Sequence, residues 1–550
     1  MKVPENDPIN VSTQTLRCVL DEIPHVKSFK GKWSLIRAKL NDLQTQLTDF
    51  AELPASTSNP LSLDVLRSVS CTLNEAFSLA RKCKGENLTE GKLRTQSDID
   101  SILAKLDRNV KDGEILIKSG VLQDGVFGGS SSKREVARGE SRNLVTRLQI
   151  GNSESKNSAM ESLLVLLQED DKNVMIAVAQ GIVPVLVRLL DSSSLEMKEK
   201  TVAAISRISV VDSSKHVLIA EGLLLLNHLL RVLESGSGFA KEKASIALQA
   251  LSFSKENARA IGSRGGISSL LEICQGGTPN SQAFAAGVLK NLAVFAEVRE
   301  NLIEENTIFV LIGLAASGTA LAQENAFGCL CNLVADDENL KLLVAKEGGI
   351  ECIRNFWDSD HPVRSLEVAV ELLRHFATCP TIAEVLVSDG FISRLASVLT
   401  CGVVGVRMAA ARALYELCFS SKTRKDMGEH GCIASLSKML DGKSSEEKEA
   451  AAKALSSLLL CAGNRRLFRK DEKGIVNAVQ LLDPSTQNLN KKYPISILTS
   501  LVHSKKCRKQ MIAAGASVYL KKLIEMDVEG AKKLSDDLGR GKLWGVFARS

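Results

Sequence analysis

The sequence predicts an all-α protein in which an N-terminal helical bundle is followed by an α-solenoid, a stack of short helical repeats. Three observations carry this prediction. Aromatic residues make up only 4% of the 550 residues and Pro occurs 11 times, whereas Leu, Ala, Ile and Val abound, a balance that favours helices over strands. One apolar pattern recurs nine times along the chain. Residues 10–120 do not follow that pattern and divide instead into longer amphipathic stretches.

The N-terminal region contains four such stretches, separated by Pro, Gly and polar segments. They are Val11–Phe29, Lys32–Leu53, Leu61–Cys83 and Ser97–Ser119. Long helices joined by short loops pack as antiparallel neighbours, so we expect residues 1–125 to form a helical bundle. The segment FGGSSSKREVARGE that follows is rich in Gly, Ser and charge, and we expect residues 126–141 to be a linker.

The repeat is recognised from short apolar runs that follow a turn residue. Examples are QGIVPVLVRLL from Gln180, GGISSLLEICQ from Gly265 and GGIECIRNFWD from Gly348. The residue before the run falls at 181, 222, 266, 307, 349, 390, 431, 474 and 515, so successive copies are 41 to 44 residues apart. A fixed period of this length indicates a solenoid, in which no copy buries its apolar stripe without its neighbours.

Before most copies lies a second helical stretch of alternating small and large apolar residues, such as SQAFAAGVLKNLA from Ser281, and a shorter amphipathic stretch separates the two. Three helices in about 42 residues, with a Gly between the short helix and the next, resemble the armadillo repeat. The resemblance implies a right-handed superhelix of about nine repeats over residues 142–538, with a basic and aromatic tail at 539–550.

The N-terminal region is similar to that of plant armadillo proteins, some of which carry a U-box ubiquitin-ligase module between bundle and repeats. Residues 127–140 are too few to hold a U-box, and no comparable Cys- and Pro-rich segment occurs elsewhere. The chain therefore resembles the plant armadillo-repeat-only family more closely. That resemblance implies a non-enzymatic scaffold.

The armadillo resemblance also implies a binding groove lined by the third helix of each repeat, where importin-α-type receptors present a Trp and, four residues later, an Asn. No Trp occupies the matching positions here, so we do not expect that mode of cargo binding. Asn291 and Asn332 still occupy the Asn position in adjacent repeats. They could hold an extended partner or satisfy neighbouring backbone within the stack. The candidate groove residues are Asn291, Asn332, His375, Glu416 and Arg412.

Positive charge is concentrated near the C-terminal end. The whole chain has a net charge of +6, whereas residues 463–550 hold 18 basic and 8 acidic residues, or +10. Three basic segments begin the short helix of the last three repeats, and equivalent positions in a solenoid align into a stripe. We call this stripe the basic ridge. Its residues are Lys422, Arg424, Lys425, Arg465, Arg466, Arg469, Lys470, Lys505, Lys506, Arg508 and Lys509.

Four interpretations of the basic ridge remain open: an acidic protein partner, an anionic membrane, nucleic acid and a solvated edge without a partner. We expect other proteins as partners, through extended peptide segments or acidic surfaces, with an anionic membrane as the alternative. Nucleic acid and small-molecule substrates are not expected. The tail GRGKLWGVFARS, with Trp544 and Phe547, is either a cap on the last repeat or a docking motif.

Catalytic and metal chemistry find no support in the sequence. Cys329 and Cys331 are two residues apart and would point to different helix faces, and the seven histidines are scattered singly. We expect no cofactor. The start lacks the apolar core of a signal peptide, so the expected location is the cytoplasm, with the nucleus as the alternative because KKCRK (505–509) resembles a localisation cluster. The expected function is a non-enzymatic scaffold; the alternative is a nuclear transport receptor-like carrier or a peripheral membrane tether.

Overall fold

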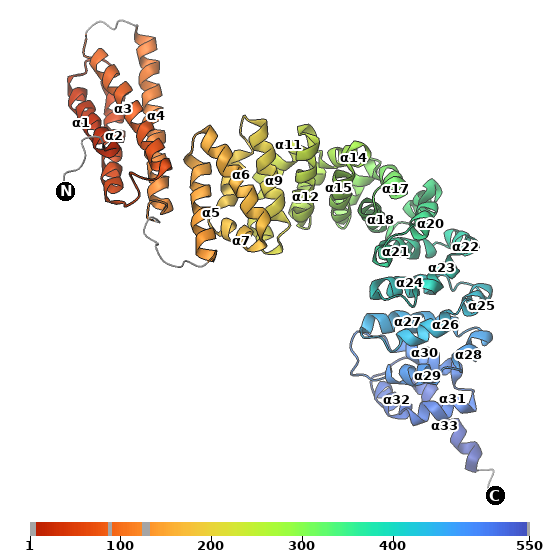
Figure 1. The fold of residues 1–550 in the computed structure, drawn as a ribbon. Helices are drawn as coiled ribbons and strands as arrows, with labels where there is room; N and C mark the ends of the chain where they lie inside the picture. Colours follow the sequence, from red (N-terminus) through yellow and green to blue (C-terminus); the bar gives the residue numbers. More distant parts are fainter. Residues whose placement is uncertain (1–6, 86–90, 124–132, 547–550) are drawn as a thin grey trace. The chain divides into compact units, whose positions relative to one another are not determined.

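The computed structural model describes residues 7–85, 91–123 and 133–546, and every regular element in those ranges is a helix (Figure 1). The predicted all-α class is thereby confirmed. The chain divides into two compact units, Met1–Leu251 and Ser252–Ser550. Each unit is described by itself below.

The first unit begins with the predicted bundle. Its helices are α1 (Pro8–Glu22), α2 (Lys30–Glu52), α3 (Pro60–Lys82) and α4 (Lys92–Ser119), with a short 3-10 turn after α1 at Ile23–His25. Helix α1 packs against α3, and α4 packs against both α2 and α3. Leu16, Trp33, Leu73 and Ile99 are fully buried in the shared core, which is what closes the four amphipathic faces against one another.

Helix α5 (Lys133–Ile150) lies partly inside the region expected to be a linker. Residues 133–141 belong to it, because the Lys, Arg, Ala and Glu residues there are good helix formers. Its second half buries Leu144, Val145 and Leu148. Helix α5 packs against α4 and against α6 (Ser153–Glu169). Of the expected linker, residues 126–132 lie outside the described residues.

Nine helical triplets follow within the described residues, two in the first unit and seven in the second. The short first helices are α7 (Asp171–Ala179), α10 (Lys215–Ala220), α13 (Lys255–Ser263), α16 (Ala296–Glu304), α19 (Glu338–Val344), α22 (Pro380–Ser388), α25 (Ser421–Glu429), α28 (Ala462–Phe468) and α31 (Lys505–Ala513). The second helices are α8 (Ile182–Leu189), α11 (Gly222–Ser235), α14 (Gly266–Gly276), α17 (Thr307–Ser317), α20 (Ile350–Asp358), α23 (Phe391–Val398), α26 (Cys432–Met439), α29 (Glu472–Gln480) and α32 (Ala516–Glu525). The third helices are α9 (Leu195–Ser209), α12 (Gly238–Leu251), α15 (Pro279–Leu292), α18 (Ala320–Val334), α21 (Leu366–Ala377), α24 (Val404–Glu416), α27 (Ser445–Leu458), α30 (Lys492–Leu501) and α33 (Ala531–Val546).

The turn between the first and second helices explains the recurring glycine. Gly348, for example, has φ of 100°, a left-handed conformation that costs a side chain with a Cβ roughly 1–2 kcal/mol. In the fourth copy, which lacks the glycine, Asn306 takes the same role with φ of 55°. Asn is among the few residues that visit this region readily.

The eighth copy departs from the pattern. Here α29 begins at Glu472 after Asp471, whose side chain caps the helix by accepting from the Gly474 N–H at 3.1 Å. Ser437 Oγ of the preceding repeat donates to the other Asp471 carboxylate oxygen at 2.7 Å. Gly474 is buried, and a Cβ on it would overlap Ser437 Oγ. This glycine is therefore needed for close packing between repeats rather than for the turn.

In the second unit the third helices lie side by side in chain order, from α15 through α18, α21, α24 and α27 to α30 (Figure 1). We call their common surface the groove face. The short first helices follow one another along a different edge, and α13 contacts α16 just as α25 contacts α28. A residue type repeated at one position of the period is thus brought into a row.

The last helix, α33, continues through residues 539–546, within the expected tail. Ala531, Leu534 and Leu538 of its first half are buried. The side chain of Trp544 and the whole of Phe547 lie outside the described part of the chain. Among the described residues no single helix has the length and apolarity to span a membrane, and two sharply bent pairs, α7 with α8 and residues 212–220 with α11, match a span by length and composition only.

Candidate functional site

The groove face owes its close packing to two asparagines on α18. Asn325 Nδ2 donates to the Ala283 carbonyl oxygen at 2.9 Å, and Asn332 Nδ2 donates to the Lys290 carbonyl oxygen at 3.0 Å. Both acceptors belong to α15. Gly328 lies between the two asparagines, and a Cβ on it would come within 2.6 Å of the Lys290 side chain. The amide of Asn332, a predicted groove residue, therefore bonds the neighbouring helix.

Asn291, the second predicted asparagine, is 5% exposed. Its Nδ2 donates to Ser252 Oγ at 2.9 Å. Of the two roles that the sequence left open for Asn291 and Asn332, these contacts match the one within the stack. Each of these bonds occupies one N–H of its amide.

The remaining predicted groove residues lie on α21 and α24. His375 is half-buried, and its Nε2 lies 3.0 Å from an Arg374 guanidinium nitrogen. Burial, followed by the nearby Arg374 charge, lowers the pKa of His375 to about 4. Arg374 Nε also donates to Glu371 Oε1 at 2.7 Å. Near neutral pH His375 is therefore uncharged, held in contact with Arg374, which in turn bonds Glu371. It cannot offer a positive charge to a partner.

A hollow of about 440 Å³ opens on the groove face across four successive third helices. Two of the predicted residues, Arg412 and Glu416, line it, whereas Asn291, Asn332 and His375 do not. The other lining residues come from α21, α27 and α30. They are Glu371, Arg374, Glu446, Glu449, Ala450, Lys453 and Tyr493.

Some charges in the hollow are already paired. Lys453 Nζ lies 3.8 Å from Glu416 Oε1 and 4.1 Å from the centre of the Tyr415 ring, a combined ion pair and cation–π contact. Arg412, Glu446 and Glu449 have no ion-pair partner among the residues that the structure describes. The hollow therefore offers one uncommitted positive charge and two uncommitted negative charges to a ligand.

The basic ridge splits into inward and outward side chains. Arg424 Nε donates to the Cys418 carbonyl oxygen at 3.0 Å, and an Arg465 guanidinium nitrogen donates to the carbonyl oxygens of Leu459 and Leu460, each at 3.0 Å. These carbonyls close the C-terminal ends of α24 and α27, where unpaired oxygens carry partial negative charge. Arg299 does the same at the end of α15, donating to Ala293 at 2.8 Å.

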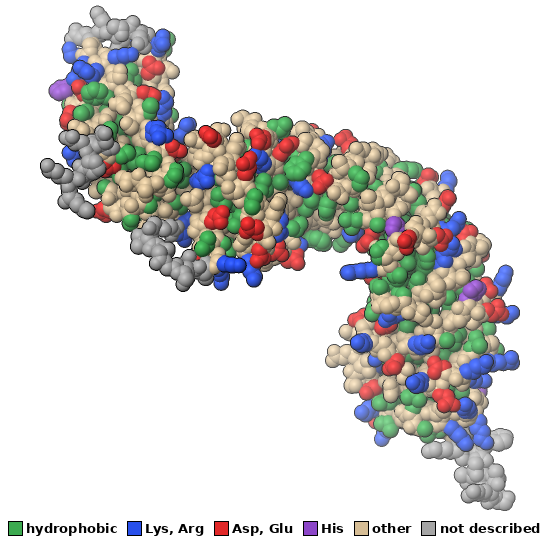
Figure 2. All heavy atoms as spheres, viewed as in Figure 1, with side chains coloured by type: hydrophobic (Ala, Val, Ile, Leu, Met, Phe, Trp, Pro, Cys, Tyr) green, Lys and Arg blue, Asp and Glu red, His purple; other side chains and the backbone are tan. Residues whose placement is uncertain are grey.

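The outward part of the basic ridge consists of exposed side chains on α25, α28 and α31 and in the turn after α28 (Figure 2). Two of them have acidic partners on the surface: Lys425 lies 3.4 Å from Glu429, and Lys506 lies 2.8 Å from Glu472. Exposed pairs of this kind hold their partners only weakly. The exposed ridge residues are Lys422, Lys425, Arg466, Lys470, Lys505, Lys506 and Lys509. Arg424, Arg465, Arg469 and Arg508 are only partly exposed.

A second hollow, of about 690 Å³, lies beside the ridge between α25–α26 and α28–α29. Leu467 and Lys470 belong to its lining, together with Lys438 and Lys473. Two aspartates also line it: Asp441 is exposed, and both oxygens of the Asp471 carboxylate already accept hydrogen bonds. The ridge is thus bordered by additional lysines.

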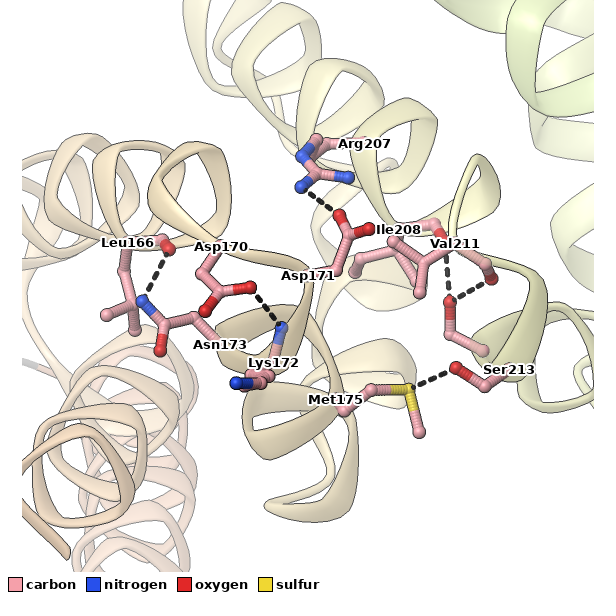
Figure 3. Close-up of polar contacts among 11 residues, drawn as sticks. Leu166, Asp170, Asp171, Lys172, Asn173, Met175, Arg207, Ile208, Val211 and Ser213 are labelled. Atoms are coloured by element: carbon pink, nitrogen blue, oxygen red, sulfur yellow. Dashed lines mark hydrogen bonds and ion pairs between the residues drawn. The ribbon is translucent and has the colours of Figure 1, made fainter. Parts of the chain in front are cut away.

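In the first triplet, hydrogen bonds hold the first helix, α7, against its neighbours (Figure 3). The Asp170 carboxylate accepts from the Lys172 N–H at 3.1 Å and caps α7, while Asn173 Nδ2 donates to the Leu166 carbonyl oxygen at 3.2 Å. Arg207, which holds the Asn position of this repeat, points to Asp171 and donates to its carboxylate at 2.5 Å. At this position, too, the side chain bonds within the stack, here to the first helix of its own repeat.

No group of three or more His, Cys, Asp or Glu side chains in the described residues is arranged to hold a metal ion. Cys274, Cys329 and Cys331 are buried, and burial raises the pKa of each thiol, for Cys274 to about 12. Thiols held in their neutral form are poor nucleophiles and poor metal ligands. These cysteines therefore act as small apolar core residues.

Comparison with known proteins gives two family matches, one over the bundle and one over the first triplet. Residues 10–121 match a family described as a domain of unknown function, DUF7032, and residues 170–210 match the armadillo/beta-catenin-like repeat. The first match spans the bundle and the second spans the first triplet. No curated protein matches the chain.

Among solved structures, the chain is similar to an engineered protein determined by a structural genomics consortium. The two are 23% identical with a TM-score of 0.60, over 73% of this chain and 98% of the other. Designed armadillo repeat proteins, one of them described as made for modular peptide recognition, match at 20% identity and a TM-score of 0.39, over 42% of this chain and 98% of theirs. The chain contains an armadillo repeat, and its fold is an α-solenoid of the armadillo type.

Sequence reasoning missed several residues that the fold brings to these surfaces. Glu446, Glu449 and Tyr493 line the hollow, but none of them occupies the Asn position or the Trp position of the repeat. The signal that could have found Glu446 and Glu449 is the acidic first half of SEEKEAAAKALSSL, the long helix of its repeat. Tyr493 is one of only three tyrosines in the chain.

Proposed function

We propose that this protein is a non-enzymatic scaffold that holds an extended segment of a partner protein on the groove face of α21, α24, α27 and α30. The observation that carries the proposal is the 440 Å³ hollow, which four successive repeats build together. A hollow shared by several repeats suits an elongated ligand better than a compact one.

The uncommitted charges define the chemistry of the segment. Glu446 and Glu449 lie one turn apart on α27 and together attract a Lys or Arg side chain. Arg412 on α24 attracts a carboxylate. We therefore propose that the segment carries a basic residue and an acidic residue, and that Tyr493 supplies apolar contact at the end of the hollow.

The basic ridge is a second surface in this proposal, directed to an anionic partner. It lies on the first helices of its repeats, whereas the groove face is built from the third helices. A scaffold with two separate surfaces can hold two partners at once. From the resemblance of the bundle and the repeats, we propose that the chain is one of the plant armadillo-repeat-only proteins.

Selection from a random peptide display library tests the groove. We expect enriched peptides that combine a basic and an acidic residue, and we expect the double variant Glu446→Lys with Glu449→Lys to bind them at least about tenfold more weakly, since opposed charges become like charges. The matched control is Glu256→Lys with Glu305→Lys, two exposed glutamates of which the first lies on α13 and the second in the turn after α16. Equal loss in the control, or failure to enrich any peptide, would contradict the proposal.

A further inference from the structure

The exposed part of the basic ridge is repeated in register over three repeats. Lys425, Arg466 and Lys509 hold the same position on α25, α28 and α31, and Lys422 and Lys506 hold another shared position. Helices α25 and α28 are in contact and packed helices are about 8–10 Å apart, so the charged rows on these two helices lie one helix spacing apart. Charges this close reinforce one another within a Debye length.

Large apolar side chains are exposed on the same first helices and in the turns that precede them. Phe419 and Leu460 stand in the turns immediately before α25 and α28, and they are 47% and 59% exposed. Leu467 on α28 and Ile512 on α31 are 40% and 39% exposed. Single exposed apolar residues are ordinary, but four of them among seven exposed cations make an amphipathic edge.

The kind of cation indicates the kind of partner. Six of the seven exposed ridge residues are Lys, and only Arg466 is Arg. Arg424 and Arg465, whose planar guanidinium groups could grip a carboxylate or phosphate with two parallel bonds, are committed to helix ends. Lysines act as point charges on flexible stems, which suits a diffuse anionic surface better than one fixed phosphate or carboxylate.

We propose that this edge docks on an anionic lipid membrane, with the exposed lysines over the headgroups and Phe419 and Leu460 inserted at the boundary of the acyl chains. Apolar insertion combined with attraction to anionic lipid is how amphipathic surfaces lie on membranes. The inference rests on the proposed function in one respect, namely that the ridge is a binding surface. It would give the scaffold a membrane location independent of its groove.

Sedimentation with phosphatidylcholine vesicles, with and without phosphatidylserine, tests the docking. We expect the full chain to bind only vesicles that contain phosphatidylserine, and to be released as salt approaches about 1 M, where the Debye length falls to about 3 Å. The triple variant Lys422→Glu, Arg466→Glu and Lys505→Glu should bind roughly a hundredfold more weakly, because each basic residue near an anionic surface contributes roughly fivefold in affinity and three such factors multiply.

A control matched in number and charge is Lys30→Glu, Lys172→Glu and Lys346→Glu. These lysines are exposed, lie on other elements and have no ion-pair partner among the described residues. The control should keep binding close to that of the unaltered chain. Equal losses in the two triple variants would overturn the proposal, because net charge rather than the ridge would then set the affinity.

A second variant, Phe419→Ser with Leu460→Ser, separates a membrane from an acidic protein. It should weaken vesicle binding by roughly tenfold or more, since each inserted side chain loses its transfer from water, and leave binding to soluble polyglutamate unchanged. If this variant binds vesicles as tightly as the unaltered chain does, and polyglutamate is bound equally tightly, the ridge binds acidic proteins. That result would overturn the membrane proposal. The groove proposal is tested separately, by measuring peptide binding: the ridge variants should bind the selected peptides as tightly as the unaltered chain does.

Discussion

Replacing Gly428 by Ala tests whether the first helices α25 and α28 are locked to each other. Gly428 is buried on α25, and a Cβ on it would overlap the Asn464 side-chain oxygen. Asn464 is 2% exposed. Its Nδ2 donates to the Arg424 carbonyl oxygen of the preceding repeat at 2.7 Å and to the Leu458 carbonyl oxygen at 3.0 Å. The asparagine therefore cannot move aside without losing both bonds.

Two effects of opposite sign decide the outcome. Ala in place of Gly within a helix gains about 1 kcal/mol of helix propensity. Forcing a methyl group against a fixed neighbour costs about 1–3 kcal/mol, and each hydrogen bond lost from a buried group costs about 1–3 kcal/mol more. We expect Gly428→Ala to destabilise this part of the stack by about 1–3 kcal/mol, against the direction that helix propensity alone predicts.

The assay is native-state hydrogen exchange on α25 and α28, because a repeat stack unfolds in parts and a single midpoint would blur the effect. Gly463→Ala is the matched control. Nothing lies closer to its added Cβ than Cys461 Sγ at 3.8 Å, so the control should be neutral or more stable by up to about 1 kcal/mol. Protection of α25 in Gly428→Ala equal to or above that of the unaltered chain would refute the reasoning.

Two further predictions concern the turns and the groove. Gly348→Ala should destabilise the local stack by about 1–2 kcal/mol, because φ of 100° is unfavourable for Ala, whereas Asn306→Gly at the equivalent turn should be nearly neutral; urea unfolding of both compares them, and equal losses would contradict the account. His375 has a pKa lowered from 6.5 to about 4, so the unfolded chain binds more protons between those values and stability should fall as pH drops from about 6.5 to about 4. His375→Gln should lose that component of the pH dependence, and an unchanged pH profile would show that the histidine is not shielded.

Much of the fold could be predicted because the repeat restates its signal every 41 to 44 residues. The expected positions 266 and 307 coincide with the first residues of α14 and α17. The four bundle helices were also predicted, with α4 beginning at Lys92 rather than Ser97. Helix starts follow from local capping and periodicity, which a sequence displays directly.

The site could be predicted only in outline, since it depends on how side chains meet across repeats. The period places Asn332 on the groove face, but only the close approach of α15 and α18 shows that its amide reaches the Lys290 carbonyl oxygen. Arg424 and Arg465 look like ridge charges in sequence, yet they turn toward the ends of α24 and α27. Successive residues on a helix are rotated by about 100° about its axis. A shift of one position therefore decides whether a side chain faces solvent or packs within the stack.

The account's central claim is that the hollow on α21, α24, α27 and α30 binds a charged, extended segment, and a charge-swap cycle tests it most directly. Two peptides are compared: a selected peptide, and the same peptide with its basic residue changed to Glu. Each is titrated against the unaltered chain and against the double variant Glu446→Lys with Glu449→Lys. We predict that the swapped peptide regains affinity for the variant, with a coupling energy of at least about 1 kcal/mol. Affinity losses that simply add, with no rescue, would contradict the claim.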